Sequence, residues 1–396
     1  MGIERRTPPA DPSLIRRVNS RTTIDVLRSD DTMTLAQLVR ASGLSRTALE
    51  GALHDLTERG LVAEVGPDAS PRSRAGDDGM TATSNGRGRP ARRFRFRHEA
   101  RYIAAVGVDR VQIHVRICDL RGDVVASTEV AGIVGDIADP ALTVISRVIR
   151  RCLREADVPE RLLGAVGVGL PGVVDPDGQI VRCLVIPSWE KADLARQLTR
   201  EFGCPAFVDN DGRFAALGEH WRGVANGAVD VVFVATGLRI GVGVMIDGAL
   251  HGGRHGAAGE IGYLRQLGWT REPPQLEALR ALYPGLPDEH AAARAAQDAA
   301  AGSAPAIDLV SDYATGLAPG LAALVLAIDP ELVVIGGAMA AAGQHFIGPL
   351  KTAVEQLVMF GPDFKQSTLG DEAMMMGATR RALNHIDERL LDLIAD

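Results

Sequence analysis

Residues 165–175 read AVGVGLPGVVD, in which a short apolar run is followed by proline and glycine. Runs of this kind recur from about residue 101 onward and alternate with stretches of helical pattern at 140–156, 191–202 and 305–328. A strand followed by a crossover helix and another strand is typical of parallel or mixed sheets. The alternation therefore predicts an α/β fold. The other predicted strands are YIAAVGV (102–108), VQIHVRICD (111–119), CPAFVD (204–209), DVVFVAT (230–236), GVGVMIDG (241–248) and LVVIGGA (332–338).

The composition is that of an ordinary folded protein rather than a disordered chain. Of the 396 residues, 46% are hydrophobic and 23% are charged, and the length predicts two to three domains. We find no apolar run long enough for a membrane span and no apolar leader near residue 1, so we expect a cytoplasmic protein. The four cysteines are widely spaced, which argues against disulfides and cysteine zinc sites.

The charge is unevenly distributed along the chain. The first 100 residues hold 17 arginines and 13 acidic residues, a net charge of +4, so the rest of the chain carries −11. A basic segment on an acidic body indicates a part that meets a polyanion. The alternative is chance in a chain that uses 40 arginines and only three lysines.

Residues 13–65 have the pattern of a small helical unit. Apolar residues at helical spacing predict helices over 13–29, 34–42 and 44–60, and the sequence LVAEV (61–65) predicts a short strand. Thr47 and Glu50 suit a capping box at the start of the third helix, with Ser45 as the alternative N-cap. Two short helices around a tight ASGLS turn, followed by a strand, predict a winged helix-turn-helix.

The third helix is the candidate recognition helix for the DNA major groove. Ser45, Arg46 and Thr47 stand at its N-terminal end, and Glu50 and His54 follow along it. Arg46 suits either a guanine edge or a phosphate, while Ser45 and Thr47 suit phosphates. The alternative is a packing domain with a solvated polar face.

Residues 66–93 are rich in Gly, Pro, Ser, Asp and Arg and predict a loop or linker. Within it, GRGRP (86–90) places Arg87 and Arg89 in an extended segment that suits a narrow minor groove. An ordinary linker is the alternative. The alternating RFRFR (93–97) that follows predicts an exposed strand.

Four motifs of the body, in the right order, resemble the ROK family of repressors, open reading frames and sugar kinases. They are GVGLPGVVD (167–175), VDND (208–211) with AALGE (215–219), GAAGEIG (256–262) and DPELVVIGG (329–337). The resemblance runs from about 101 to 390, and the helix-turn-helix with GRGRP resembles the N-terminal part of ROK repressors. It implies an actin-like, hexokinase-like ATPase fold of two lobes.

The resemblance also implies which residues meet a sugar. Asp211 takes the position of the catalytic base, and Asn210 and Glu260 take positions that contact sugar hydroxyls. Glu277 matches a further sugar-contacting glutamate. Carboxylates of this kind suit bidentate hydrogen bonds to polyols.

The phosphate loops depart from the family pattern. The family's Asp-x-Gly-Gly-Thr is DRVQI (109–113) here, and its Gly-Thr-Gly-x-Gly is GLRIG (237–241). Glycine lets backbone N–H groups approach a phosphate closely, and the side chains of Val111 and Gln112 obstruct that approach. We therefore expect that ATP transfer is lost, that no cofactor is needed, and that the chain is not an enzyme.

Three further departures concern the effector and zinc. The family's zinc-binding histidine, which also touches sugar, is Tyr263 here, and residues 264–275 contain no cysteine, so we expect no structural zinc. A family asparagine matches Val185. Arg213 stands where the family often has Asn, and either pairs with Asp211 or receives an anionic effector.

These observations predict a DNA-binding transcriptional regulator, a repressor, whose ROK body binds a sugar or sugar derivative. We expect it to bind a double-stranded operator as a homodimer or a dimer of dimers, without a membrane partner. The alternatives are an active sugar kinase with an accessory domain and a ligand-free dimerisation scaffold. The predicted domains are a winged helix-turn-helix (1–66), a wing and linker (67–99) and ROK lobes at 100–215 and 216–396, with a C-terminal helix that can return to the first lobe.

Overall fold

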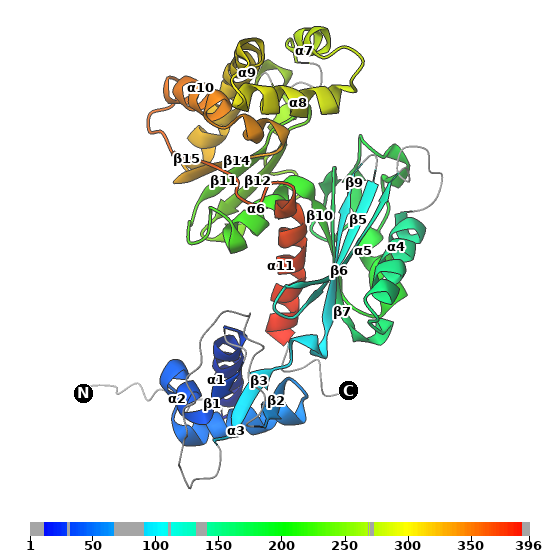
Figure 1. Cartoon of the computed structure of the whole chain (residues 1–396), viewed down its shortest axis with the longest axis vertical. Helices are drawn as coiled ribbons and strands as arrows, with labels where there is room; N and C mark the ends of the chain where they lie inside the picture. The colour runs from blue at the N-terminus through cyan, green and yellow to red at the C-terminus, as the bar shows by residue number, and fades with distance from the viewer. Residues whose placement is uncertain are drawn as a thin grey trace, which may run out of the picture. The chain divides into compact units, whose positions relative to one another are not determined.

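A computed structural model describes residues 12–29, 32–66, 91–109, 112–131, 141–267, 269 and 273–389 of the chain. The chain divides into two compact units. Within the described residues, the first unit holds the N-terminal part up to Arg101 together with Asp119–Arg121 and the end of the last helix, and the second unit holds the rest. Each unit is described by itself (Figure 1).

In the described residues before Val62, the first unit forms three helices, as the sequence predicts. Thr34 opens α2 through a capping box with Gln37, and Gly43, at φ 69°, ends it. Ser45 caps α3 by accepting a hydrogen bond from the Ala48 backbone N–H, so Ser45, not Thr47, is the N-cap. The helices are α1 (Pro12–Arg28), α2 (Leu35–Ser42) and α3 (Arg46–Glu58).

The core of this unit lies between α1, α3 and a small sheet. On α1 the residues Ile24 and Leu27 are fully buried, whereas Ile15 and Val18 are about half exposed, so the predicted apolar stripe covers only the C-terminal half of the helix. An antiparallel sheet in the order β1-β3-β2 completes this unit. Its strands are β1 (Met33–Thr34), β2 (Val62–Val65) and β3 (Arg93–Phe96).

The RFRFR sequence forms β3, but the prediction of an exposed strand is wrong. Phe94 and Phe96 are 3% and 1% exposed. Successive side chains of a strand point to opposite faces, so both aromatic rings enter the core while the arginines face out. Arg92 and Arg28 stack their guanidinium groups over Phe94 and Phe96 at 5.2 and 5.1 Å. The alternation marks a strand with one buried face.

The first sheet of the second unit runs in the order β10-β7-β4-β5-β6. Alternate residues of its strands face two different layers (Figure 1). Ala104 and Val106 belong to the core that includes α4 and α5, whereas Ala105 packs with Phe214 of α6 and Met375 of α11. The elements are β4 (Tyr102–Val108), β5 (Gln112–Asp119), β6 (Val124–Ala131), α4 (Ala141–Glu155), β7 (Leu163–Leu170), the hairpin β8 (Val173–Val174) and β9 (Ile180–Arg182), α5 (Leu194–Phe202) and β10 (Ala206–Asn210).

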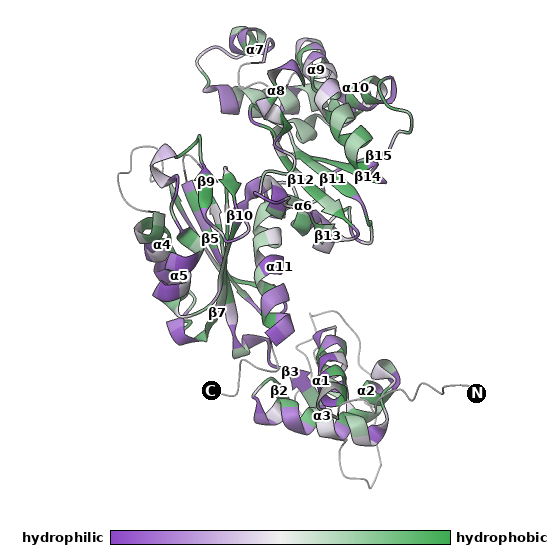
Figure 2. Cartoon of the chain, turned by 180° about the vertical axis from the view of Figure 1, so that it is seen from behind, coloured by the Kyte–Doolittle hydropathy of each residue, from purple (hydrophilic) through white to green (hydrophobic). Residues whose placement is uncertain are grey.

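The second sheet runs in the order β13-β12-β11-β14-β15. Val232 and Val234 of β11 face the helices α8, α9 and α10, while Val231 and Phe233 face α6. Figure 2 shows β11, β12 and β14 as a continuous hydrophobic layer. The elements are α6 (Asp211–Arg222), β11 (Val231–Ala235), β12 (Gly241–Ile246), β13 (Ala249–Leu250), α7 (Leu276–Leu282), α8 (Asp288–Ala300), α9 (Ala304–Ile328), β14 (Leu332–Gly336), α10 (Gln344–Glu355), β15 (Asp363–Gln366) and α11 (Glu372–Arg389).

Helix α9 is long and apolar enough to cross a membrane by length and composition alone. Its buried side chains, such as Val310 and Leu321, instead join the core between α8, α10 and the second sheet. Core helices of globular proteins show the same all-round hydrophobicity. We therefore assign α9 as the core helix of this sheet.

Two helices approach each other closely through glycine. A Cβ on Gly218 of α6 would lie 2.0 Å from the carbonyl oxygen of Ala373, and a Cβ on Gly377 of α11 would meet the carbonyl oxygen of Phe214 at 1.7 Å. Any larger residue would push the helices apart. Helix α6 is thus fixed against α11 on one side and against β12 on the other.

The last turn of α11 belongs to the first unit. The side chain of Asp387, 4% exposed, accepts a hydrogen bond from Arg28 at 2.5 Å, and Arg21 donates to the Asp387 carbonyl oxygen at 2.6 Å. Asp387 therefore neutralises two arginines of α1. Removing one partner of a buried ion pair is costly because the other charge stays buried.

Asp387→Asn should destabilise α1 by about 3 kcal/mol, because it leaves Arg28 partly buried without a carboxylate. Hydrogen exchange of the α1 amides measures this locally. The matched control is Asp25→Asn, which removes an exposed partner of Arg21 at 3.2 Å and should cost less than about 1 kcal/mol. Equal protection of α1 in both variants would contradict the structural role of Asp387.

Candidate functional site

The candidate site forms where β10 ends and α6 begins. Asn210 is the N-cap of α6; its Oδ1 accepts from the Arg213 backbone N–H at 3.1 Å and its Nδ2 donates to the Gly172 carbonyl at 3.0 Å. This places the side chain of Asp211 in the first turn, where the helix dipole favours a carboxylate. The carbonyl of Gly172 lies in the GVGLPGVVD segment, so two of the sequence motifs meet here.

Three carboxylates come together at this point. Asp211 is half-buried, and its Oδ1 accepts from the Gly212 N–H at 2.8 Å. Burial raises the pKa of Asp211 to about 6, the Gly212 N–H and Arg239 oppose the rise, and the carboxylate of Asp109 adds to it. Burial and the carboxylate of Asp211 also raise the pKa of Glu260. Asp211 and Glu260 thus lie close enough for their charges to interact, and their role in binding a sugar stays a prediction.

Arg213 does not pair with Asp211. Its guanidinium binds Asp209 at 2.5 Å and donates to the carbonyl of Gly256 at 2.8 Å. Asp209 was not among the candidate residues, although its spacing of four from Arg213 is the spacing of helical ion pairs. Because the Arg213 guanidinium is buried against Asp209, it does not offer a free cation to an anionic effector.

Two other predicted site residues stand apart from the carboxylates. Tyr263 is 59% exposed, in a short 3₁₀ turn after Glu260. Glu277 is exposed on the first turn of α7. Among the described residues, neither Tyr263 nor Glu277 hydrogen-bonds to Asp211 or Glu260. Their place in an effector site stays a prediction.

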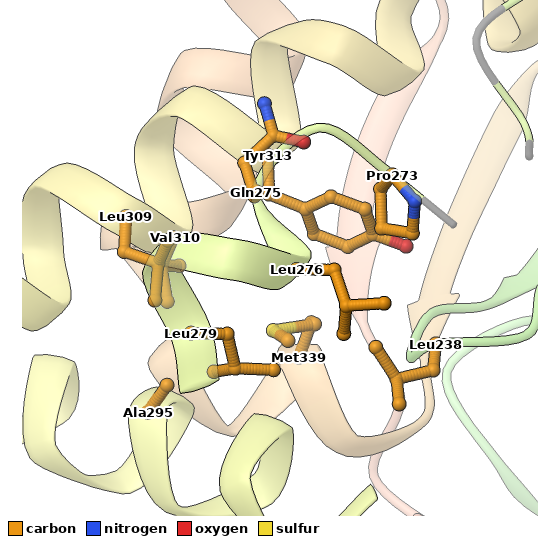
Figure 3. A pocket seen from close by; sticks show the side chains of 10 residues that line it. All are labelled: Leu238, Pro273, Gln275, Leu276, Leu279, Ala295, Leu309, Val310, Tyr313 and Met339. Atoms are coloured by element: carbon orange, nitrogen blue, oxygen red, sulfur yellow. The ribbon is translucent and has the colours of Figure 1, made fainter. Parts of the chain in front are cut away.

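The second glycine loop, residues 237–241, is held by the protein itself. The Tyr313 hydroxyl donates to the carbonyl of Gly237 at 2.5 Å, and Arg239 pairs with Glu289 of α8 at 3.0 Å. Leu238 points into an apolar pocket (Figure 3). The pocket is lined by Leu238, Pro273, Gln275, Leu276, Leu279, Ala295, Leu309, Val310, Tyr313 and Met339.

This pocket does not fit a nucleotide. Its free space is about 20 Å³, room for about one water molecule. Of the first phosphate loop, Arg110 and Val111 lie outside the described residues. Within the described part of the chain, no group of three His, Cys, Asp or Glu side chains could hold a metal ion.

The predicted DNA-contacting residues of α3 share one exposed face. Ser45, Arg46, Thr47, Glu50 and His54 are all exposed, whereas the opposite face of α3 is buried. The Arg46 side chain is 76% exposed and pairs with Glu50 at 3.0 Å, and His54 lies 3.4 Å from Glu58. An exposed ion pair of this kind is weak and exchanges readily for a phosphate or a base.

Arg87 and Arg89 of the GRGRP segment lie outside the described residues, so their contact with a minor groove stays a prediction. Just before β3, Arg92 makes two hydrogen bonds to Glu64 of β2 at 2.7 and 2.6 Å. Arg95 of β3 makes two hydrogen bonds to Glu99 at 3.0 and 2.6 Å. The first pair links the residues before β3 to β2, and the second pair is local to the end of β3.

The fold defines a class: a hexokinase-like α/β body preceded in the chain by a small unit of helices and an antiparallel sheet. The family model that matches is that of the ROK family, over residues 104–268 and 276–384. The chain belongs to the ROK family.

The relatives include both repressors and kinases. The xylose repressor of Caldicellulosiruptor bescii is 21% identical over 395 residues, which cover 92% of this chain and 95% of the repressor. The glucokinase of Halalkalibacterium halodurans is 30% identical over 244 residues, 54% of this chain and 74% of the glucokinase.

Solved structures share the fold. The crystal structure of a ROK family transcriptional regulator, a homologue of the E. coli MLC protein, has a TM-score of 0.69 at 19% identity and covers 96% of this chain and 98% of its own. A ROK family glucokinase from Streptomyces griseus, in complex with glucose and AMPPNP, has a TM-score of 0.56 at 22% identity, covering 72% and 99%.

The raised pKa of Asp211 gives a testable pH dependence. A folded-state pKa of about 6, above the ordinary 3.8, means that the folded chain binds more protons than the unfolded chain between about pH 4 and 6. Stability from this group therefore falls as the pH rises through that window. The variant Asp211→Asn should lack this pH-dependent loss of stability. It should therefore be more stable than wild type by about 2 kcal/mol at pH 7.5.

Chemical denaturation at pH 4.5 and 7.5 measures this difference. The control is Asp177→Asn, an exposed aspartate in the turn between β8 and β9, which should leave the pH profile as in wild type. An unchanged pH profile in Asp211→Asn would mean that another group carries the shift.

Proposed function

We propose that this chain is a cytoplasmic DNA-binding transcriptional regulator, a repressor, whose ROK body binds a sugar and has lost phosphoryl transfer. The observation that carries the proposal is the extent of similarity: the match to a xylose repressor spans 92% of this chain, including the helix-turn-helix, whereas the match to a glucokinase spans 54%. The exposed polar face of α3 supports the same function.

The sugar is recognised by carboxylates in this proposal. Asp211 and Glu260 accept hydrogen bonds from adjacent hydroxyl groups of an aldose. Burial raises the pKa of both carboxyl groups, and the rise is increased by Asp109 at Asp211 and by Asp211 at Glu260. The xylose repressor relatives make D-xylose the first sugar to test, and the glucokinase relatives make D-glucose the second. A hydroxyl donor relieves the repulsion between the two carboxylates, so binding stabilises their ionised forms.

DNA is recognised by the first unit of two copies. The half-sites of a palindromic operator lie about 34–36 Å apart, or at multiples of this spacing. A sugar that shifts the population of body conformations changes the spacing of the two recognition helices and so the affinity for the operator. Dimerisation, as a homodimer or dimer of dimers, is part of this proposal.

Loss of phosphoryl transfer follows from the loop chemistry. A kinase cradles phosphates with glycine N–H groups, and the chain replaces them with Leu238, Arg239 and the DRVQI sequence. The retained Asp211 is the observation that favours the alternative of an active sugar kinase, and the exposed Tyr263 favours a ligand-free scaffold.

Arg46→Ala should weaken binding to a DNA fragment from upstream of the chain's own gene by about tenfold or more, because a guanidinium contact with a base or phosphate is lost. Fluorescence anisotropy at fixed salt measures the affinity. The matched control is Arg294→Ala, an exposed arginine paired with Asp298 four residues on, at 2.9 Å. Full affinity in Arg46→Ala would show that α3 is not the recognition helix.

D-xylose or D-glucose should change the DNA affinity of wild type and raise its melting temperature. A ligand at 100 times its dissociation constant stabilises by about 2.7 kcal/mol. Asp211→Ala should abolish both effects while keeping the DNA affinity measured without sugar.

A coupled assay of ADP release with both sugars separates the alternatives. We expect no sugar-dependent ADP release. Robust release without specific DNA binding would identify a kinase. Specific DNA binding without a response to either sugar would favour the scaffold.

A further inference from the structure

Arg213 is a buried residue of the candidate site: its guanidinium pairs with Asp209 rather than with Asp211, and its charge opposes the rise in the pKa of Glu260. Arg213 is 7% exposed. Its Nη2 lies 2.5 Å from Asp209 Oδ1, and its Nη1 donates to the carbonyl oxygens of Gly256 at 2.8 Å and Val174 at 3.5 Å. One side chain thus binds three separate segments of the chain.

The three segments come from both sheets of the second unit. Asp209 lies on β10 of the first sheet, and Val174 lies on β8, beside β10. Gly256 lies in the loop that follows β13 of the second sheet and leads to Glu260. Arg213 itself projects from α6, which contacts both β10 and β12. The guanidinium therefore joins a loop of one sheet to two strands of the other half of the unit.

The loop 252–260 packs without spare room at this point. Gly256 has φ +71°, and a Cβ there would lie 1.7 Å from the carbonyl oxygen of Val174. A Cβ on Gly252 would lie 3.0 Å from the Arg213 guanidinium. The backbone of the loop thus lies directly against β8 and Arg213. While the Arg213 guanidinium is in place, the loop backbone is confined to this one position.

Local hydrogen bonds link the position of Gly256 to that of Glu260. The Ala258 N–H donates to the Gly252 carbonyl at 3.2 Å, and the Glu260 N–H donates to the Ala257 carbonyl at 3.2 Å. These short-range turns leave little freedom between Gly256 and Glu260. Holding Gly256 therefore fixes where the carboxylate of Glu260 lies relative to Asp211.

We propose that Arg213 is a positioning residue of the effector site, which uses Asp209 as its counter-ion to hold the loop 252–260 in the sugar-binding arrangement before any sugar is present. The proposal rests on the proposed function for the identity of the effector. It assigns Arg213 no direct contact with the sugar. A preformed site binds more tightly because less of the protein must be ordered on binding.

Only arginine among the polar side chains suits this position. Its planar guanidinium donates in several fixed directions at once, to a carboxylate and to two carbonyls. Lysine offers a single compact ammonium group, and asparagine is too short to reach all three partners from α6. Where the family often has Asn, this chain therefore has an arginine that anchors the loop 252–260.

The test uses the full-length variants Arg213→Asn and Arg213→Lys. Hydrogen exchange without sugar should speed up at least tenfold at Ala258 and Glu260 in both variants, while amides of β4, β7, β11 and β14 keep their protection. The matched control is Arg222→Asn at the other end of α6, which should leave the loop amides as in wild type.

Calorimetry gives the second readout, with D-xylose and D-glucose as probes. If the loop is correctly placed in a tenth of the molecules, the apparent affinity for the sugar that binds wild type falls tenfold. Asp209→Asn should have a similar effect. The double variant Asp209→Asn/Arg213→Asn should be no worse than either single variant, because the two side chains act as one unit.

Unchanged loop exchange in Arg213→Asn would overturn the proposal, as would a loss of protection spread evenly over both sheets, which marks a purely structural role. If wild type binds neither sugar, the proposed effector class is wrong, and the exchange result alone decides whether Arg213 positions the loop. The two failures are therefore distinguishable.

Discussion

The second unit depends on one constraint, the close approach of neighbouring backbones to helix α6. Gly218 and Gly377 let α6 and α11 touch backbone to backbone, and a Cβ on Gly243 of β12 would lie 2.5 Å from the Gly212 carbonyl oxygen. Because α6 is clamped from two directions, its first turn has one position. The positions of Asn210 and Asp211 are set by that first turn. The placement of the Asp211 carboxylate relative to Glu260 therefore depends on it.

The same constraint separates the residues that place Asp211 from the glycine loop at 237–241. Asp211 is placed by the junction of two buried elements, β10 and α6, whose packing tolerates few changes. Residues 237–240 lie between β11 and β12, and connecting segments generally vary more in sequence than the elements they join. Here Leu238 and Tyr313 fill and tie down what remains of one loop.

The fold was largely predictable from the sequence because its central strands are short apolar runs. The runs at 102–108, 165–170 and 332–336 lie in the predicted strands. The polar, short or exposed strands β6, β8, β9, β13 and β15 have no such signal, and the sheet context forms them. The RFRFR strand shows the limit of a local pattern: alternation identifies the strand but does not say that a core will cover Phe94 and Phe96.

The site was predictable only in part. Asp211, Asn210 and Glu260 follow from motifs, and the structure brings them together. The ion-pair partner of Arg213 could not be predicted. Asp209 and Asp211 both lie a few residues before Arg213, so sequence distance allows either as the partner, and the direction of the first helical turn decides between them. The resemblance alone groups Tyr263 and Glu277 with the site; the structure leaves both exposed.

The ion pairs of Asp387 have a consequence for the order in which the protein is made. The carboxylate that neutralises Arg28 is synthesised 359 residues after it. Since domains generally fold as units during synthesis, N-terminal first, the helix-turn-helix emerges from the ribosome early but lacks this counter-ion until α11 has been translated. The DNA-binding unit is therefore completed last, and a fragment that ends near residue 101 would carry two arginines of α1 without their partner.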